Sequence, residues 1–221
     1  MSKNSILPKV NRIIALAFLV HCLIGLSGCA TSIIKIAKPT PDIIKEYKSI
    51  VVWAKNPGMR DTGVEVKRGD YVTILAEGEI NVWPARQGFI LNPYDTLLFR
   101  VGEKNLVEGY QGLAITPIYS DGHLYLGYID GPIDKYGEPK NPQFYNDNTG
   151  HFVVDIIVWK TNDPILMAKF FDEASQRDPQ NAALKEISTN FDKRKELFVA
   201  EQKAKRELAE AGKAITALQR E

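Results

Sequence analysis

The middle of the chain alternates short apolar runs with clusters of turn-forming residues. Between residues 48 and 160 the runs are rich in β-branched and aromatic side chains: SIVVWA, YVTILAEG, LLFRVG, GLAITPIYS, LYLGYI and HFVVDIIVW. Gly, Pro, Asn and Asp separate them, and these residues favour tight turns. Short strands at this spacing are typical of an antiparallel β-sandwich or barrel. The pattern therefore predicts a mainly β domain, with a two-residue hairpin at Asp121-Gly122.

The last of these runs predicts a central strand. Alternate side chains of a strand point to opposite faces. One face would carry Phe152, Val154, Ile156 and Val158, and the other Val153, Asp155, Ile157 and Trp159. A strand that is apolar on both faces is typically covered on both sides.

From Thr161 the period of the apolar residues changes to that of a helix. Asn162-Asp163-Pro164 places a capping side chain before a proline that needs no amide hydrogen, which predicts a helix start. This helix would reach about Arg177, with inward positions Ile165, Ala168, Phe170, Phe171 and Ala174. Asp178-Pro179 predicts the start of a second, long charged helix.

The apolar positions late in the second helix have the spacing of a coiled-coil seam. They are Ala204, Leu208, Ala211, Ile215 and Leu218, separated by 4, 3, 4 and 3 residues. Residues 161–221 would therefore form either a helical hairpin packed on the β domain or a stalk that meets a partner.

The first 28 residues have the pattern of a secretion signal. Lys3, Lys9 and Arg12 precede an apolar segment of 12 residues, Ile13 to Ile24. In a helix this segment would span roughly 18 Å, against the ~30 Å hydrocarbon core of a bilayer. It is too short to cross a membrane and suits the apolar core of a signal peptide.

Leu26-Ser27-Gly28-Cys29 follows this segment and resembles the bacterial lipobox. The resemblance implies cleavage before Cys29 and acylation of its thiol, which would anchor the mature protein to a membrane. The other interpretation is an ordinary signal peptide, or a signal anchor, with an incidental cysteine. Residues 29–47, which contain Pro39 and Pro41, would form a lipidated tether.

The residue after the cysteine bears on localisation. In Gram-negative lipoproteins an Asp at that place often signals retention at the inner membrane. Here Ala30 follows Cys29. The resemblance therefore implies a lipid-anchored protein of the bacterial cell envelope, at the outer membrane in preference to the inner.

Composition excludes several classes of function. Without residues 1–28 the chain has 25 Lys and Arg against 27 Asp and Glu, so it has no basic excess for nucleic acid. Of the two cysteines, one leaves with the signal, and Cys29 carries the lipid.

Ser120-Asp121-Gly122-His123 contains a nucleophile, an acid and a base, but neighbours on a tight turn point in different directions. We therefore expect a protein that is not an enzyme.

The segment from Val64 to Val158 resembles the PA-IL-like (LecA-type) galactophilic lectins. The stretches that carry the resemblance are VEVKRGDYVTILAEGEI, LLFRVG, LGYID and YNDNTGHFVVDI. It covers about half of the chain. It implies a galactose-binding-like antiparallel sandwich of the jelly-roll type, over residues 48–160, that binds sugar in a calcium-dependent manner.

The resemblance also implies a calcium site. In that family an acidic residue after one strand, and an Asn pair before the next, surround the ion. Asp130 matches the acidic residue, and Asp147 and Asn148 match the pair. Asp134, in the long loop 131–146, is a substitute ligand if Asp130 does not reach Asp147. A main-chain carbonyl near Val82 or Trp83 would add a further oxygen, and calcium takes six to eight.

The same residues have a simpler interpretation. Asn and Asp favour tight turns, so Asn146, Asp147 and Asn148 also suit a turn without any cation. The sequence leaves a calcium site and a cation-free turn as alternatives.

The sugar site of the family is only partly matched. Gln87-Gly88 fits its Gln-Gly step, whereas Pro84 stands where the family has a His. Aromatic residues in or beside the loops could stack on sugar rings. The candidate ligand-binding residues are Trp83, Gln87, Tyr136 and Tyr145. The alternative for each aromatic ring is packing at the edge of the sandwich.

Two hypotheses of function result. The first is a membrane-anchored lipoprotein with a non-catalytic, calcium-dependent module for a galactose-like glycan. The second is a structural or assembly lipoprotein of the envelope in which the sugar site has been lost. In the second case the helix of residues 180–220 would recruit a protein partner or another copy of itself.

Overall fold

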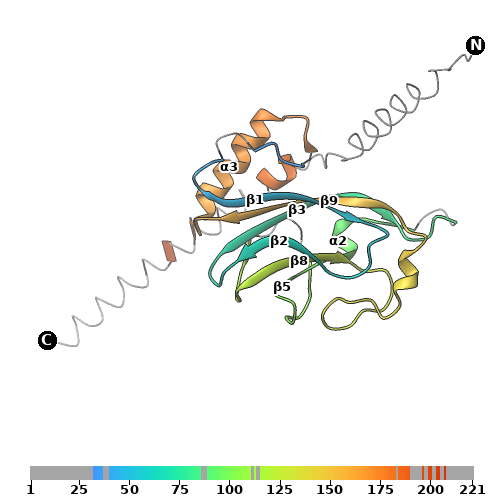
Figure 1. The fold of residues 1–221 in the computed structure, drawn as a ribbon. Helices are drawn as coiled ribbons and strands as arrows, with labels where there is room; N and C mark the ends of the chain where they lie inside the picture. The colour runs from blue at the N-terminus through green and yellow to red at the C-terminus, as the bar shows by residue number, and fades with distance from the viewer. Residues whose placement is uncertain are drawn as a thin grey trace, which may run out of the picture. The chain divides into compact units, whose positions relative to one another are not determined.

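The computed structural model contains two antiparallel β-sheets stacked face to face (Figure 1). It describes residues 32–36, 40–85, 89–110, 112, 115–182 and 184–189, and positions 196, 199–200, 203–204 and 207. The signal segment, Cys29 and most of the predicted coiled coil lie outside these residues.

The first sheet has the order β1 (Ile44–Trp53), β9 (Thr149–Trp159), β3 (Tyr71–Asn81) and β4 (Ile90–Leu91), and β7 (Ile115–Pro117) also pairs with β3. The second has the order β2 (Arg60–Val66), β8 (Gly122–Tyr128), β5 (Leu97–Val101) and β6 (Glu108–Gly109). The fold is therefore the mainly β antiparallel sandwich that the alternation of strands and turns predicts.

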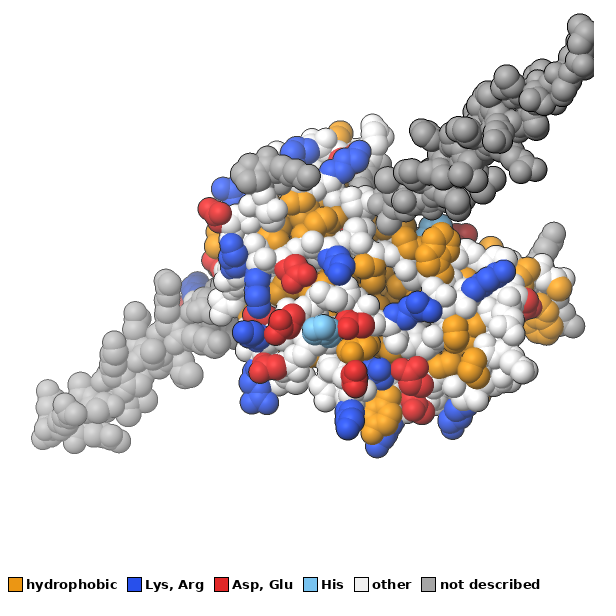
Figure 2. Space-filling view, in the orientation of Figure 1, with side chains coloured by type: hydrophobic (Ala, Val, Ile, Leu, Met, Phe, Trp, Pro, Cys, Tyr) orange, Lys and Arg blue, Asp and Glu red, His pale blue; other side chains and the backbone are white. Residues whose placement is uncertain are grey.

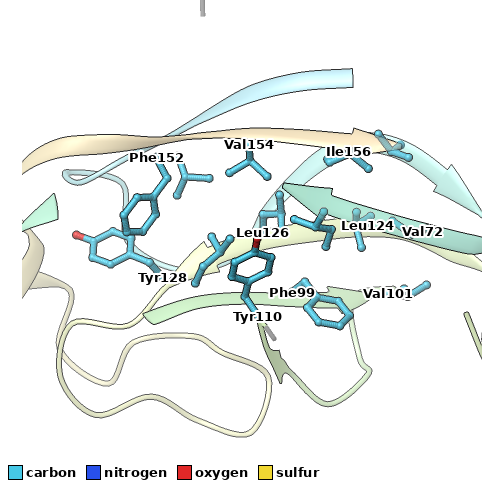
Figure 3. Packing of buried hydrophobic residues seen from close by; sticks show 14 of the residues in the cluster. Val72, Phe99, Val101, Tyr110, Leu124, Leu126, Tyr128, Phe152, Val154 and Ile156 are labelled. Carbon is cyan, nitrogen blue, oxygen red and sulfur yellow. The ribbon is translucent and has the colours of Figure 1, made fainter. Parts of the chain in front are cut away.

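Strand β9 is central, as predicted. It pairs with β1 on one side and with β3 along its whole length on the other. Its inner face carries Phe152, Val154, Ile156 and Val158, which pack between the sheets. In Figure 3 the first three of these approach Leu124, Leu126 and Tyr128 of the opposite sheet. Burial of such side chains contributes about 1.5–3 kcal/mol each, so this inner layer is a main source of stability.

A second core lies on the outer face of the first sheet. There Ile157 and Trp159 contact helix α3 (Pro164–Arg177) and residues of the helical segment 184–189. Helix α3 begins where the sequence predicts, because the Asp163 carboxylate accepts a hydrogen bond from the Ile165 amide at 2.8 Å. Of the predicted inward positions, Ile165 is exposed at the first turn, and the remaining four are buried. As far as residue 189, the helices therefore pack on the sandwich (Figure 1).

The segment of residues 32–36 belongs to this second core. Ile33 and Ile34 are buried, and the Ile34 amide donates to Oδ2 of the fully buried Asp155 at 2.7 Å. The Tyr47 hydroxyl lies 3.0 Å from the same Oδ2, and Nδ2 of Asn181 donates to the Ile33 carbonyl at 2.8 Å. The structure thus differs from the tether expected for residues 29–47, since part of that range is docked and β1 begins at Ile44.

The prediction of a hairpin at Asp121-Gly122 is wrong. β7 pairs with β3 in the first sheet, whereas β8 begins at Gly122 in the second sheet. The turn is therefore a crossing between sheets. Oδ1 of Asp121 accepts from the Arg68 amide at 2.7 Å and ties this crossing to the turn before β3.

No helix within the described part of the chain is long and apolar enough to span a bilayer. On the face seen in Figure 2, acidic and basic side chains are interspersed, with hydrophobic groups between them.

Asp155 offers a test of the second core. Asp155→Ala would remove the acceptor of the Ile34 amide, which costs about 1–3 kcal/mol for a buried donor, while the Tyr47 hydroxyl would keep the Ile34 carbonyl as an acceptor. We expect a lower free energy of unfolding in urea and faster proteolysis near residue 34. Asp155→Asn keeps one acceptor oxygen and should lose less.

Glu79→Ala is the matched control, because Glu79 is exposed on another position of the same sheet. Equal stabilities for Asp155→Ala and Glu79→Ala would contradict the role given to Asp155.

Candidate functional site

Asp130 and Asn148 meet at one end of the sandwich. Asp130 follows β8 of the second sheet, and Asn148 precedes β9 of the first. Nδ2 of Asn148 donates to Oδ2 of Asp130 at 2.7 Å and to the Tyr128 hydroxyl at 2.8 Å. Asn148 is fully buried, and its Oδ1 has no hydrogen-bond partner among the described residues. The structure therefore brings together two of the predicted ligands and leaves one buried oxygen unsatisfied.

Two buried tyrosines fix the backbone at this point. The Tyr145 hydroxyl accepts from the Asp130 amide at 3.0 Å and donates to the Tyr128 carbonyl at 3.1 Å. Tyr145 lies on a 3-10 turn, η1 (Pro142–Tyr145), and its ring packs edge-on against Tyr128 at a centroid distance of 5.1 Å. Because Tyr145 is only 1% exposed, its role is to hold Asp130, which differs from the predicted contact with a ligand.

The carboxylates at this site favour a positive partner. Asp130 is half-buried, and loss of solvent raises its pKa. The hydrogen bond from Asn148 opposes this rise, and the negative charge of Asp147 adds to it. Asp147 is therefore close enough to act on Asp130, although its own side chain is exposed.

The donor set fits a hard cation in its chemistry. Two carboxylates and one orphaned amide oxygen are the ligand types that calcium takes. Among the described residues, no three His, Cys, Asp or Glu side chains gather into a metal cluster. A cation at this site would therefore rely on Asn148 and on main-chain oxygens in addition to Asp130 and Asp147.

The end of β3 lies beside the start of β9, on the side away from β1. Asn81 pairs with Thr149, so Val82 continues the strand at the level of Asn148. Trp83 follows, is 42% exposed, and packs against Phe89 at a centroid distance of 5.6 Å. The register thus places the predicted carbonyl contributors at the same end of the sheet. Gln87 lies outside the described residues.

Asp134 has a different position from the other predicted ligands. Its Oδ1 accepts from the amides of Tyr136 at 2.8 Å and Glu138 at 2.9 Å. These bonds lower its pKa and fold the tip of the loop back on itself. The Asp134 carboxylate therefore stabilises the turn in which it lies. The long loop still allows Asp130 to contact Asn148.

A buried arginine anchors this loop. Arg100 on β5 is 6% exposed, and its guanidinium donates to the Tyr136 carbonyl and pairs with Glu138 at 3.2 Å. It also lies 5.0 Å from the centre of the Tyr125 ring. Tyr136 is half-buried beside these contacts. Sequence reasoning missed Arg100, although an arginine inside the apolar run LLFRVG is a visible signal.

A depression adjoins the Asn148 side of the site. It has a volume of about 480 Å³ and is lined by residues 53–56 and 148–150. Trp53, the last residue of β1, is 51% exposed at its edge and lies 4.8 Å from the His151 ring. Sequence reasoning also missed Trp53, because it closes an apolar run that reads as an ordinary strand.

Comparisons with known proteins add little to this geometry. No family model matches the chain, and no curated protein matches it. One solved structure to which it is similar is the EclA N-terminal domain, described as a PllA-like lectin. The sequences are 24% identical, the match covers 50% of this chain and 94% of that one, and the TM-score is 0.41. At this level the function has to be argued from the residues themselves.

Arg100→Met should loosen the loop while keeping most of the side-chain volume. The Tyr136 carbonyl and Glu138 would lose their charged donor, and hydrogen bonds to charged groups contribute about 1.5–3 kcal/mol. Trypsin cleavage after the exposed Lys135 and Lys140 should therefore accelerate by at least about tenfold under native conditions.

Arg60→Met, on the exposed start of β2, serves as the control for loss of one arginine. The anchoring role is refuted if both variants are cut in the loop at the rate of the wild type.

Proposed function

We propose that this chain is a non-catalytic module that binds carbohydrate with the help of a calcium ion. The observation that carries the proposal is the fully buried Oδ1 of Asn148, which has no partner within the part of the chain that the structure describes and belongs to a side chain bonded to Asp130. A buried oxygen left unsatisfied is costly, and a cation beside it would remove that cost. The same cation would offset the repulsion between Asp130 and Asp147 that helps to raise the Asp130 pKa.

Several residues would together coordinate such an ion. Asp130 and Asp147 would supply carboxylate oxygens, Asn148 its free amide oxygen, and Val82 or Trp83 a carbonyl. Tyr145 fixes the Asp130 backbone by a hydrogen bond and so limits how far that carboxylate can move. A bound calcium ion supplies open coordination positions for hydroxyl groups.

Sugar binding is supported by the chemistry around this point. Trp83 is a partly exposed aromatic ring at the same end of the first sheet, and aromatic faces suit the apolar side of a pyranose. The carboxylates of Asp130 and Asp147 can accept hydrogen bonds from hydroxyls. A galactose-like glycan is the ligand class that the resemblance to PA-IL-like lectins implies.

We also propose that the module is held on the bacterial envelope by lipid at Cys29, with the outer membrane as the favoured location. The support is the order of basic start, short apolar segment and Leu-Ser-Gly-Cys in the sequence. The assembly hypothesis depends on the C-terminal helix, most of which lies outside the described residues.

Lipid attachment is tested by metabolic labelling of bacteria with an alkyne analogue of palmitate. The wild-type chain should be labelled and should sediment with membranes. Cys29→Ser should abolish the label and leave an unprocessed precursor, whereas Cys22→Ser should change neither. Labelling of the Cys29→Ser variant would refute the proposal of a lipid anchor at Cys29.

Calcium binding should raise the melting temperature of the wild type, and EDTA should reverse the shift. Asp130→Asn and Asn148→Leu should each reduce the calcium-dependent shift strongly, because they remove a donor oxygen. Asp134→Asn is the matched control, since one amide oxygen can still accept from the Tyr136 and Glu138 amides. A shift lost in Asp134→Asn and kept in Asp130→Asn would overturn the assignment.

The shift should also depend on pH. Calcium needs Asp130 ionised, so the shift should shrink as the pH falls through the Asp130 pKa, which burial raises. Without calcium the dependence of stability on pH has the opposite sign. The folded state then favours the protonated carboxyl, and stability is lost as the pH rises between the unfolded and folded pKa values.

A further inference from the structure

Trp53 presents an aromatic face on the opposite side of β9 from Trp83. Val52 points into the core between the sheets, so alternation turns Trp53 to the outer face. Its ring is supported from the side by His151, at 4.8 Å between centroids and a tilt of 46°. A large apolar side chain that is held in place and half exposed is suited to contact with a ligand.

Polar groups surround this face. The depression beside Trp53 is lined by Lys55, Asn56, Asn148 and Thr149 among others. Lys55 and Thr149 are exposed and Asn56 is half-buried, so an ammonium, a hydroxyl and an amide are available to hydroxyl groups. An aromatic face with polar donors and acceptors at its edge matches a pyranose, which has an apolar face and a hydroxyl rim.

The depression adjoins the candidate cation site. Asn148 lines it, and the same side chain is bonded to Asp130. The strand order β1, β9, β3 places Trp53 at the end of one neighbour of β9 and Trp83 just beyond the end of the other. Neighbouring strands lie about 4.8 Å apart, so two strand spacings separate β1 from β3 by roughly 10 Å. Trp83 also lies beyond Glu79, the residue of β3 level with Trp53, so the two chain positions are further apart than this lateral distance. That span is wider than a single sugar ring.

We propose that the Trp53 depression is a second sugar subsite, and that the ligand is therefore an oligosaccharide of at least two rings. One ring occupies the cation site, and the next stacks on Trp53, with Asn56 and Thr149 bonding its hydroxyls. This inference rests on the proposed function, which it extends from a sugar to an oligosaccharide.

The experiment uses the full chain in detergent micelles with calcium, on an array of immobilised mono- to tetrasaccharides. For each glycan that binds, titration calorimetry then compares it with its terminal monosaccharide. The wild type should bind the oligosaccharide roughly tenfold more tightly than the monosaccharide. Trp53→Ala should remove this difference while leaving the monosaccharide affinity and the calcium-dependent melting shift unchanged.

Matched variants separate the two subsites. Trp53→Phe keeps an aromatic face and should keep most of the oligosaccharide preference. Trp83→Ala should weaken the monosaccharide and the oligosaccharide alike. In addition, acrylamide quenching of tryptophan fluorescence in a Trp83→Phe background should fall when the oligosaccharide is bound, because Trp159 is buried and Trp53 is then the exposed tryptophan among the described residues.

The outcomes distinguish the two proposals. An array that stays blank for the wild type overturns carbohydrate binding and the second subsite with it. Glycan binding that is the same for wild type and Trp53→Ala, or no preference for oligosaccharides, overturns the subsite alone. If Trp53→Ala alters the calcium-dependent shift, Trp53 acts on the cation site and the subsite is likewise refuted.

Discussion

The candidate site depends on one buried amide group that joins the two sheets. Nδ2 of Asn148, at the start of β9, reaches Tyr128 and Asp130 at the end of β8 in the opposite sheet. These bonds fix the direction of the side chain and leave its oxygen as an acceptor for which residues 32–36, 40–85, 89–110 and 115–182 supply no donor. Burial makes that oxygen costly in the protein by itself. The side chain is therefore held between the sheets by two hydrogen bonds, and its buried oxygen is a group that calls for an explanation such as a bound ion or water.

The long loop of residues 131–146 does not disturb this arrangement because it folds as a unit of its own. Asp134 closes the tip of the loop through two backbone amides, and Arg100 holds that tip on the second sheet. Gly137 has a φ of +83° and packs where an added Cβ would lie 2.9 Å from Met59, so the tip fits closely against the turn before β2. The two ends of the loop thus bring Asp130 and Asn148 into contact.

Much of the fold could be predicted from local pattern, and much of the site could not. The alternation in HFVVDIIVW gave both faces of β9, because strand geometry is local. The turn at Asp121-Gly122 has hairpin chemistry, yet the partner of β7 is β3, and strand pairing is decided by the whole sheet. The roles of Arg100 and Trp53 depend on contacts with distant segments, which local sequence pattern does not reveal. The proximity of Asp130 and Asn148 was reached through a family resemblance, since no rule of spacing predicts it.

The docked segment at residues 32–36 also sets an order for folding. Ile33 receives a hydrogen bond from Asn181, 148 positions later, and Ile34 donates to Asp155, 121 positions later. Within the described residues, β1 likewise pairs only with β9, the last strand. A chain that is synthesised from its N-terminus therefore delivers residues 32–36 long before their partners arrive, and contacts of such separation form slowly. Until α3 and the segment after it have been made, Ile33 and Ile34 have no core to enter, and they are available to a chaperone during that interval.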